Sequence, residues 1–260
     1  MSYHKGLLKV ANRVITKSWP VKLSHSNLSS AVATICFDDF PRSAWTVGGS
    51  ILEDFGVRGT YFVSAAFSPD RLRMQPAAGS IPAVTFYELE DVVEAYKRGH
   101  EIGCHTYDHI NVPLLNNTEL EHSLLHNAAF FRKLLGDEPI ISFAYPQGSV
   151  NVRTKHLCAK NFTVCRGTHF GLNSGIIDLA LLRSIALNDT FSPDTELDKL
   201  IANAKLKKAW LIFYAHDISE NPSQWGCTSG IFEQLVTKLL DNDIDIITLK
   251  AGANRVLKNR

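Results

Sequence analysis

The amino-acid sequence predicts an α/β fold in which one mainly parallel sheet curls into a closed or distorted barrel with helices outside it. Apolar, β-rich runs alternate along the chain with segments of helical periodicity. This alternation is typical of a parallel sheet covered by helices. About seven or eight such units follow one another, and this number favours a single barrel domain over an open sheet.

The expected strands are, in chain order, 31–38, 59–64, 100–105, 140–145, 162–166, 180–187, 209–216 and 243–248. The expected helices between them are 43–55, 85–98, 118–135, 151–160, 194–207 and 229–241.

Capping residues and apolar stripes support several of these helices. The helix from 118 has Asn117 or Thr118 as a side-chain cap and Gly136 to end it. The helix 229–241 presents one apolar stripe, as expected of a helix that packs on a sheet.

Two segments fall outside the repeating units. Residues 3–18 form a weakly amphipathic pattern, so we expect residues 1–30 to be an N-terminal extension packed on the barrel, with the catalytic domain at 31–260. Residues 65–84 show no regular pattern and are expected to overhang the barrel as a lid.

Charge, hydropathy and cysteine content exclude several classes of protein. The net charge of +1 gives no electrostatic reason to expect a nucleic-acid partner. No apolar run approaches the roughly 18 residues of a membrane span, and none resembles the apolar core of a secretory signal. We therefore expect a cytoplasmic protein.

The five cysteines contain no C-x-x-C pair, so reduced, buried thiols are expected. The oligomeric state is left open.

Two adjacent carboxylates, Asp38 and Asp39, lie at the end of the first predicted strand in the segment TICFDDF. Chemistry in such barrels takes place where strands end. A cap for the helix at 43–55 needs only one aspartate. Two ionised carboxylates side by side are costly unless a positive charge lies near them.

Two histidines with H-x3-H spacing lie at the end of the third predicted strand: His105 is its last residue and His109 follows it. If the chain turns helical at Thr106, both imidazoles reach one metal ion. The pair His122 and His126 has the same spacing, but it lies within a predicted helix and is interpreted as structural or solvent-facing.

A metal near His105 and His109 explains the paired aspartates. Asp39 would supply an oxygen ligand to zinc or a similar ion, and Asp38 would take a proton from water bound to it. His216 ends another predicted strand, 209–216, and is suited to protonating a leaving amine.

Four segments, CFDDF, HTYDH, FAYPQG and FYAHDI, resemble in order and separation the signature segments of the polysaccharide deacetylases, carbohydrate esterase family four. The similarity covers about residues 31–250. It implies a distorted (β/α) barrel with about seven parallel strands. It also implies Asp38 as catalytic base, His216 as general acid, and a metal held by Asp39, His105 and His109.

The third segment departs from the family pattern R-x-P-[YW], because Ala144 stands at the arginine position and Gln147 at the aromatic one. The backbone N–H of Gln147 can still stabilise an oxyanion. Arg166 or Arg183 would replace the missing arginine, and we favour Arg166 because it ends a predicted strand. The candidate substrate and oxyanion residues are Tyr145, Pro146, Gln147, Phe40, Tyr107 and Trp225.

The resemblance implies a zinc-dependent carbohydrate N-deacetylase, although Co²⁺, Ni²⁺ or Fe²⁺ also suits two histidines and a carboxylate. The expected substrate is an N-acetylated amino sugar of a surface-polysaccharide or glycolipid precursor. Two alternatives stay open: hydrolysis of another C–N bond in a small cyclic amide, and an inactive barrel that only binds sugar.

Overall fold

The computed structural model of the protein describes residues 15–74, 84–188, 190–191, 193 and 196–258. Most of the predicted helix at 3–18, and residues 75–83 of the predicted lid, lie outside these residues. Of the remaining lid, Ala65–Phe67 forms η2 and Pro69–Met74 forms α3. None of the helices within the described residues combines the length and apolarity that a membrane span requires.

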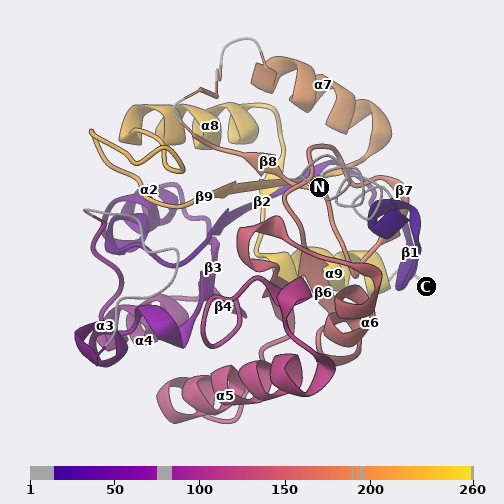
Figure 1. Ribbon diagram of the computed structural model, residues 1–260. Coiled ribbons are helices and arrows are strands. Elements are labelled where there is room, and N and C mark those ends of the chain that lie inside the picture. Colours follow the sequence, from indigo (N-terminus) through magenta and orange to yellow (C-terminus); the bar gives the residue numbers. More distant parts are fainter. Residues whose placement is uncertain (1–14, 75–83, 189, 192, 194–195, 259–260) are drawn as a thin grey trace, which may run out of the picture.

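Parallel strands form the centre of the molecule, and helices surround them (Figure 1). The strands run in the spatial order β6-β5-β4-β3-β2-β9-β8, and β10 also pairs with β2. Their bounds are β2 (Val32–Phe37), β3 (Thr60–Val63), β4 (Glu101–Cys104), β5 (Ser142–Ala144), β6 (Val164–Arg166), β8 (Ile185–Ala186), β9 (Trp210–Ala215) and β10 (Asp245–Ile246).

The sheet curls until its two edges nearly meet. A single bridge between Arg166 and Leu182 joins the end of β6 to the segment that leads into β8. The predicted distorted (β/α) barrel with about seven parallel strands is confirmed. The longest register runs from Val32 opposite Trp210 to Phe37 opposite Ala215, so β2 and β9 end side by side.

Both faces of the sheet are buried, which explains the continuous apolar runs in its sequence. Alternate residues of β2 and β9, such as Val32, Trp210 and Ile212, pack inside the barrel against Leu249 and Ala253. Leu249 and Ala253 belong to α9 (Leu249–Lys258), which also contacts β6. The outward-facing residues pack beneath the surrounding helices.

The other helical elements lie between the strands in the expected order. They are η1 (Ala44–Gly49), α2 (Ser50–Asp54), α4 (Leu89–Lys97), η3 (Val112–Leu114), α5 (Asn117–Leu135), η4 (Pro146–Gly148), α6 (Val152–Asn161), α7 (Glu196–Lys207) and α8 (Ser229–Asp241). The expected helix at 43–55 is split into η1 and α2, and the helix expected from 85 begins at Leu89.

The prediction of a strand over 180–187 is wrong for most of its length, because only Ile185–Ala186 is a strand. The backbone before it bonds to other segments instead: Leu182 N–H donates to Cys165 O. The sequence also did not predict α9 or a small antiparallel pair of β1 (Leu23–Ser26) with β7 (Gly175–Asp178).

Candidate metal and catalytic site

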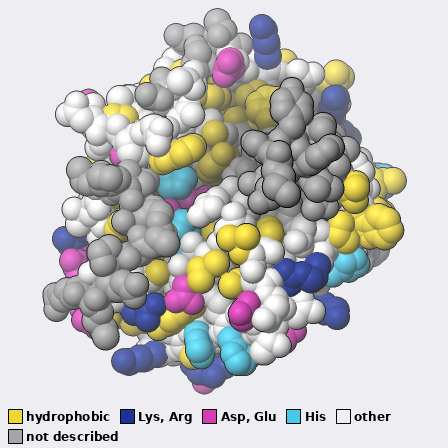
Figure 2. All heavy atoms as spheres, viewed as in Figure 1, with side chains coloured by type: hydrophobic (Ala, Val, Ile, Leu, Met, Phe, Trp, Pro, Cys, Tyr) yellow, Lys and Arg dark blue, Asp and Glu magenta, His cyan; other side chains and the backbone are white. Residues whose placement is uncertain are grey.

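The polar residues singled out in the sequence follow the carboxyl ends of four strands that lie near one another in the barrel. Asp38 and Asp39 follow β2, His105 follows β4, Arg166 ends β6 and His216 follows β9. Asp38 N–H donates to Ala215 O at 3.0 Å, which fixes the first residue after β2 against the last residue of β9. On this face of the molecule, histidine and acidic side chains meet in a recess (Figure 2).

Left-handed backbone conformations bring these side chains together. Asp39 and Phe40 have φ of 63° and 51°, and Thr106 and His109 have φ of 65° and 51°. Residues other than glycine adopt such angles infrequently, and clusters of them are associated with functional sites. The helix expected from Thr106 does not form. Two left-handed residues, and not a helical turn, place the His105 and His109 rings with their centroids 5.2 Å apart.

Asp39, His105 and His109 form a buried cluster in which each offers one ligand atom within 4.8 Å of the others. Asp39 Oδ1 lies 3.5 Å from His105 Nε2 and 3.2 Å from His109 Nε2. Among the described residues, no donor bonds to this buried oxygen. A buried carboxylate oxygen without a donor is costly unless a cation occupies the site.

His105 is held in the orientation that metal-binding histidines adopt. Its Nδ1 lies 2.8 Å from Ala144 O, and a carbonyl oxygen can only accept, so Nδ1 carries the proton and Nε2 presents a lone pair. Burial is the main cause that lowers the pKa of His105 to about 4. The ring is therefore neutral at pH 7, as a ligand must be, and this donor set fits a zinc ion.

Asp38 pairs with Arg166, whose Nη2 lies 2.5 and 2.6 Å from the two carboxylate oxygens. Burial raises the pKa of Asp38, but the charge and hydrogen bonds of Arg166, together with smaller contributions from His105 and His216, hold that pKa below its ordinary value. Arg183 instead bonds to Phe170 O and is exposed. Of the two candidate arginines, Arg166 is thus the one that contacts Asp38.

Two aromatic rings that the sequence analysis did not single out hold Arg166. Its guanidinium carbon lies 5.3 Å from the centroid of the Phe62 ring and 4.8 Å from that of Tyr214. Both distances permit cation–π attraction. The inward-facing alternation Trp210, Ile212, Tyr214 in β9 is the signal that could have indicated Tyr214.

His216 faces the cluster from β9. Its Nε2 lies 3.7 Å from Asp39 Oδ2, and its backbone N–H donates to Trp225 O. Trp225 is half-exposed, with its ring centroid 6.3 Å from that of His216. Asp217 fixes the loop between them, because its carboxylate accepts from Ser223 N–H and Ser223 Oγ.

The predicted substrate-contacting residues divide into buried and accessible ones. Phe40 and Tyr145 are completely buried. Neither ring therefore presents a face to a sugar, contrary to the expectation from the sequence. The left-handed turn directs Phe40 against Tyr61, and Tyr145 donates its hydroxyl proton to Ala180 O.

The remaining candidates are placed as follows: Tyr107 is partly buried beneath Arg71, Pro146 is buried, and Gln147 is exposed with a φ of 57°. The second histidine pair, His122 and His126, is exposed on α5 with its rings stacked on each other.

Comparisons with known proteins agree with this architecture. No curated protein matches the sequence. A family model described as polysaccharide deacetylase matches residues 25–163, just over half of the chain.

Three solved structures illustrate the similarity in fold. The first is a family 4 carbohydrate esterase from Bacillus anthracis, with 16% identity, coverage of 97% of this chain and 93% of that chain, and a TM-score of 0.58. The peptidoglycan deacetylase PdaC from Bacillus subtilis gives 15% identity, 89% and 94% coverage, and a TM-score of 0.51. A mutant described as a CE4 family pseudoenzyme gives 15% identity, coverage of 91% of this chain and 71% of that chain, and a TM-score of 0.54. Because proteins described as active and inactive share the fold, function has to be argued from the site.

Proposed function

Because the chain belongs to the polysaccharide deacetylase family, we propose that it is a metal-dependent hydrolase that removes an N-acetyl group from an amino sugar. The observation that carries the proposal is the meeting of three groups at one end of the barrel. These are the Asp39–His105–His109 cluster, the Asp38–Arg166 pair and His216. Binding a sugar requires neither a carboxylate kept ionised in a buried pair nor a histidine opposite it.

Asp39, His105 and His109 would hold the metal, for which we favour Zn²⁺ over Co²⁺, Ni²⁺ or Fe²⁺. When bound, the ion supplies Lewis acidity that makes water a nucleophile at neutral pH and stabilises charge on the acetyl oxygen. The three protein ligands would leave a position open for water and substrate, as in catalytic zinc sites generally.

Asp38 would act as the general base, accepting a proton from the attacking water. This role needs an ionised carboxylate, and the pKa of Asp38 lies below its ordinary value in spite of burial, with Arg166 as the largest of the causes that lower it. Arg166 donates to both carboxylate oxygens and so also fixes the orientation of the group. It would thus serve as the positioning residue for the base, from β6 and not from the third signature segment.

His216 would act as the general acid, donating a proton from its imidazolium to the amine nitrogen as the C–N bond breaks. It lies at the end of β9 beside Asp38, with its ring toward Asp39. The backbone N–H of Gln147 would stabilise the developing oxyanion, and Pro146 before it restricts the turn that aims it.

For the substrate we propose an N-acetylated sugar of a surface-polysaccharide or glycolipid precursor, with Tyr107 and Trp225 as wall residues. Exposure of half the Trp225 side chain next to His216 supports a role in holding the sugar ring. Ala144 and Gln147 give the site different walls from those of the family pattern. The proposal assigns catalysis to residues 31–260, with residues 1–30 as an N-terminal extension.

Acetate release tests this function. The zinc-loaded protein is incubated with N-acetylated oligosaccharides and nucleotide-linked N-acetyl sugars, and acetate is measured for wild type, Asp38→Asn and the exposed control Asp54→Asn. We expect Asp38→Asn to lower kcat/KM by about 10²–10⁴-fold without loss of bound metal, and Asp54→Asn to match wild type.

Acetate absent from all substrates would reject the deacetylase. Hydrolysis of a small cyclic amide by the same protein would then identify the alternative C–N hydrolase. Sugar binding without any turnover would identify an inactive barrel.

A further inference from the structure

Thr106 lies between the two histidines of the cluster in a conformation that its side chain disfavours. Its φ is 65°, and a left-handed backbone is a genuine outlier for a residue that is branched at Cβ. Thr106 is completely buried, and among the described residues no partner bonds to its hydroxyl. Its own side chain therefore makes no hydrogen bond that would hold the conformation. Such strain persists only where the surrounding structure imposes it.

The two peptide groups on either side of Thr106 are each held by a serine hydroxyl. Ser64 Oγ donates to His105 O at 2.6 Å, and Tyr107 N–H donates to Ser123 Oγ at 3.1 Å. Because each peptide group is planar, the orientations of these two define φ and ψ of Thr106. Ser64 follows β3 and Ser123 lies in α5, so the left-handed turn is fixed from two separate elements.

Backbone hydrogen bonds join the same segment to the residues after β3. His105 N–H donates to Val63 O at 3.2 Å, and Ala66 N–H donates to Tyr107 O at 2.8 Å. Together with the two serine contacts, these bonds give a partner to both backbone polar groups of His105 and to both of Tyr107.

Asn127 fixes α5 against the end of β3. It lies one turn after Ser123 on the buried face of the helix and is completely buried. Its Oδ1 accepts from Ala65 N–H at 3.2 Å, and its Nδ2 donates to Val63 O at 2.9 Å. A polar side chain on a buried helix face costs stability unless it is hydrogen-bonded. Here Asn127 bonds to the residues that flank Ser64, so the two serines are held relative to each other.

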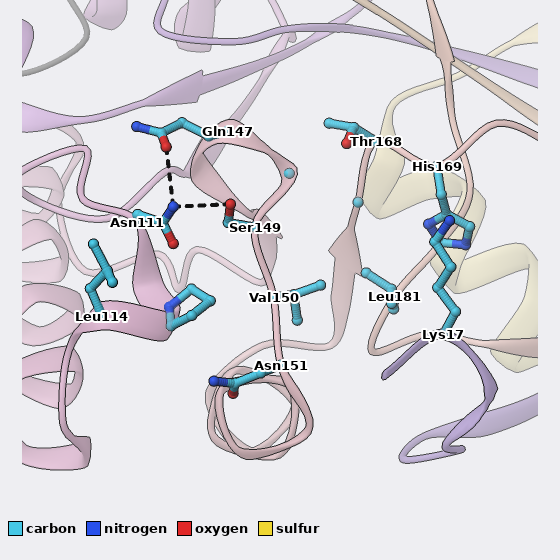
Figure 3. A pocket seen from close by; sticks show the side chains of 13 residues that line it. Lys17, Asn111, Leu114, Gln147, Ser149, Val150, Asn151, Thr168, His169 and Leu181 are labelled. Atoms are coloured by element: carbon cyan, nitrogen blue, oxygen red, sulfur yellow. Dashed lines mark hydrogen bonds between the residues drawn. The ribbon is translucent and has the colours of Figure 1, made fainter. Parts of the chain in front are cut away.

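The far end of the segment with the two histidines has a separate anchor. Asn111, two residues after His109, donates from Nδ2 to Gln147 Oε1 at 3.3 Å and to Ser149 Oγ at 3.1 Å (Figure 3). Gln147 and Ser149 follow β5, and with Asn111 they line a cavity of about 520 Å³. The segment is therefore tied to its neighbours on both sides of His109.

We propose that Ser64 and Ser123 are positioning residues for the metal ligands. By fixing the peptide groups on either side of Thr106, they hold His105 and His109 toward Asp39. Metal binding then does not have to impose the left-handed turn itself, and affinity gains from this preorganisation. The inference rests on the proposed function, because it concerns the metal site on which that function depends. It adds that a helix carrying none of the three ligands helps to set the affinity for the ion.

Metal affinity tests this role separately from catalysis. The proteins are wild type, Ser64→Ala, Ser123→Ala, the double variant and the control Phe131→Leu. Phe131 lies on the same buried face of α5, one turn after Asn127, and its truncation removes no hydrogen bond to the segment. Zn²⁺ affinity is measured by competition with a chromophoric chelator, and the Co²⁺ absorption spectrum reports coordination geometry. Urea unfolding of the metal-free proteins reports stability, and acetate release is followed in parallel.

We expect each serine variant to weaken Zn²⁺ binding by about 3- to 10-fold, the value of one neutral hydrogen bond. The double variant should lose about 10- to 100-fold, as is typical when groups that orient metal ligands are removed. Its Co²⁺ bands should shift or broaden, because the two imidazoles are no longer held in one geometry. Phe131→Leu should lower stability but keep the affinity and spectrum of wild type.

Glycine in place of Thr106 gives the sharpest comparison. Glycine adopts left-handed angles without strain, so Thr106→Gly reduces the need for the two serines. The double serine substitution should then weaken Zn²⁺ binding less in the Thr106→Gly protein than in wild type, by a factor of about three or more. If the double variant does not fold, Ser123→Ala alone is compared in the two backgrounds.

Wild-type affinity in both serine variants, or an equal loss with threonine and with glycine at position 106, overturns the positioning role. Wild type that binds no Zn²⁺ overturns it together with the metal site. The deacetylase and the positioning role otherwise fail separately. Acetate release with an affinity that ignores the serines contradicts only the positioning role, and serine-dependent Zn²⁺ binding without acetate contradicts only the deacetylase.

Discussion

Arg166 places its Nη2 2.5 and 2.6 Å from the two carboxylate oxygens of Asp38, although 128 positions separate them in the sequence. Both side chains are buried, so each charge is left uncompensated if the other is removed. Arg166→Gln should destabilise the fold by about 3–5 kcal/mol, because it leaves a buried carboxylate unpaired. It should also raise the pKa of Asp38.

The pH profile separates this positioning role from a purely structural one. In the pH profile of kcat/KM, the acid limb is the fall in activity at low pH. Loss of Arg166 should shift this limb to higher pH by at least about one unit, because a neighbouring guanidinium typically lowers an aspartate pKa by that much. The control Arg183→Gln removes an exposed arginine and should leave the limb in place. An unmoved acid limb in Arg166→Gln would contradict the assignment of Asp38 as the base.

The Tyr214 ring should contribute to the same pair through its contact with Arg166 at 4.8 Å. Tyr214→Leu removes the cation–π contact and should lower stability by about 1–2 kcal/mol. The acid limb should move in the same direction as in Arg166→Gln, but by less. Tyr214→Phe keeps an aromatic face and should behave as wild type. If the leucine and phenylalanine variants have the same pH profile, the ring does not position Arg166.

Trp225 should act on substrate binding and not on folding, because half of its side chain is exposed. Trp225→Ala should raise KM by about 3- to 10-fold, the value of one aromatic contact, with kcat nearly unchanged. The free energy of unfolding should change by less than about 0.5 kcal/mol. Trp225→Phe serves as the conservative control. Unchanged KM in the alanine variant would remove Trp225 from the sugar site.

His100 should make the protein sensitive to acid. Burial, followed by the charge of Arg58, lowers its pKa to about 4, although Glu53 opposes the shift. Gly59 N–H donates to His100 Nδ1 at 3.0 Å, which requires that nitrogen to be unprotonated. The unfolded chain binds a proton below pH of about 6.5, whereas the folded protein does not until about pH 4.

The contribution of His100 to stability is therefore complete above pH of about 6.5 and declines between 6.5 and 4. One proton corresponds to a slope of up to about 1.4 kcal/mol per pH unit. Urea unfolding of metal-free wild type and His100→Gln at several pH values checks this. The variant should be less stable at pH 7 but should show a shallower decline. Parallel curves would exclude His100 as a cause of acid sensitivity.

The pattern of apolar runs predicts the barrel because both faces of its sheet are buried, and it locates the strand ends that carry Asp38, His105 and His216. It does not predict α9, whose apolar face consists of a few residues separated by lysine, glycine and asparagine. The pairing of β1 with β7 is also missed, because two short strands about 150 positions apart leave no local pattern.

Side-chain direction after a strand end is the part of the site that the sequence could not supply. The spacing of His105 and His109 indicates a common ligand, but it suggests a helical turn where two left-handed residues are found. The same conformation at Asp39 and Phe40 places the aspartate in the cluster with His105 and His109 and the phenylalanine in the core. Such angles are determined by tertiary packing and are not readable from residue type.

The central claim is that Asp39, His105 and His109 hold one catalytic metal ion. Elemental analysis of wild type and of the His105→Ala/His109→Ala double variant, with acetate release measured on the same samples, tests it most directly. The exposed pair His122→Ala/His126→Ala is the matched control, since it has the same spacing on α5. We expect about one metal ion per chain in wild type and control, and loss of both metal and acetate release in the double variant. Metal content that is unchanged by the double substitution, or acetate release from metal-free protein, would contradict the claim.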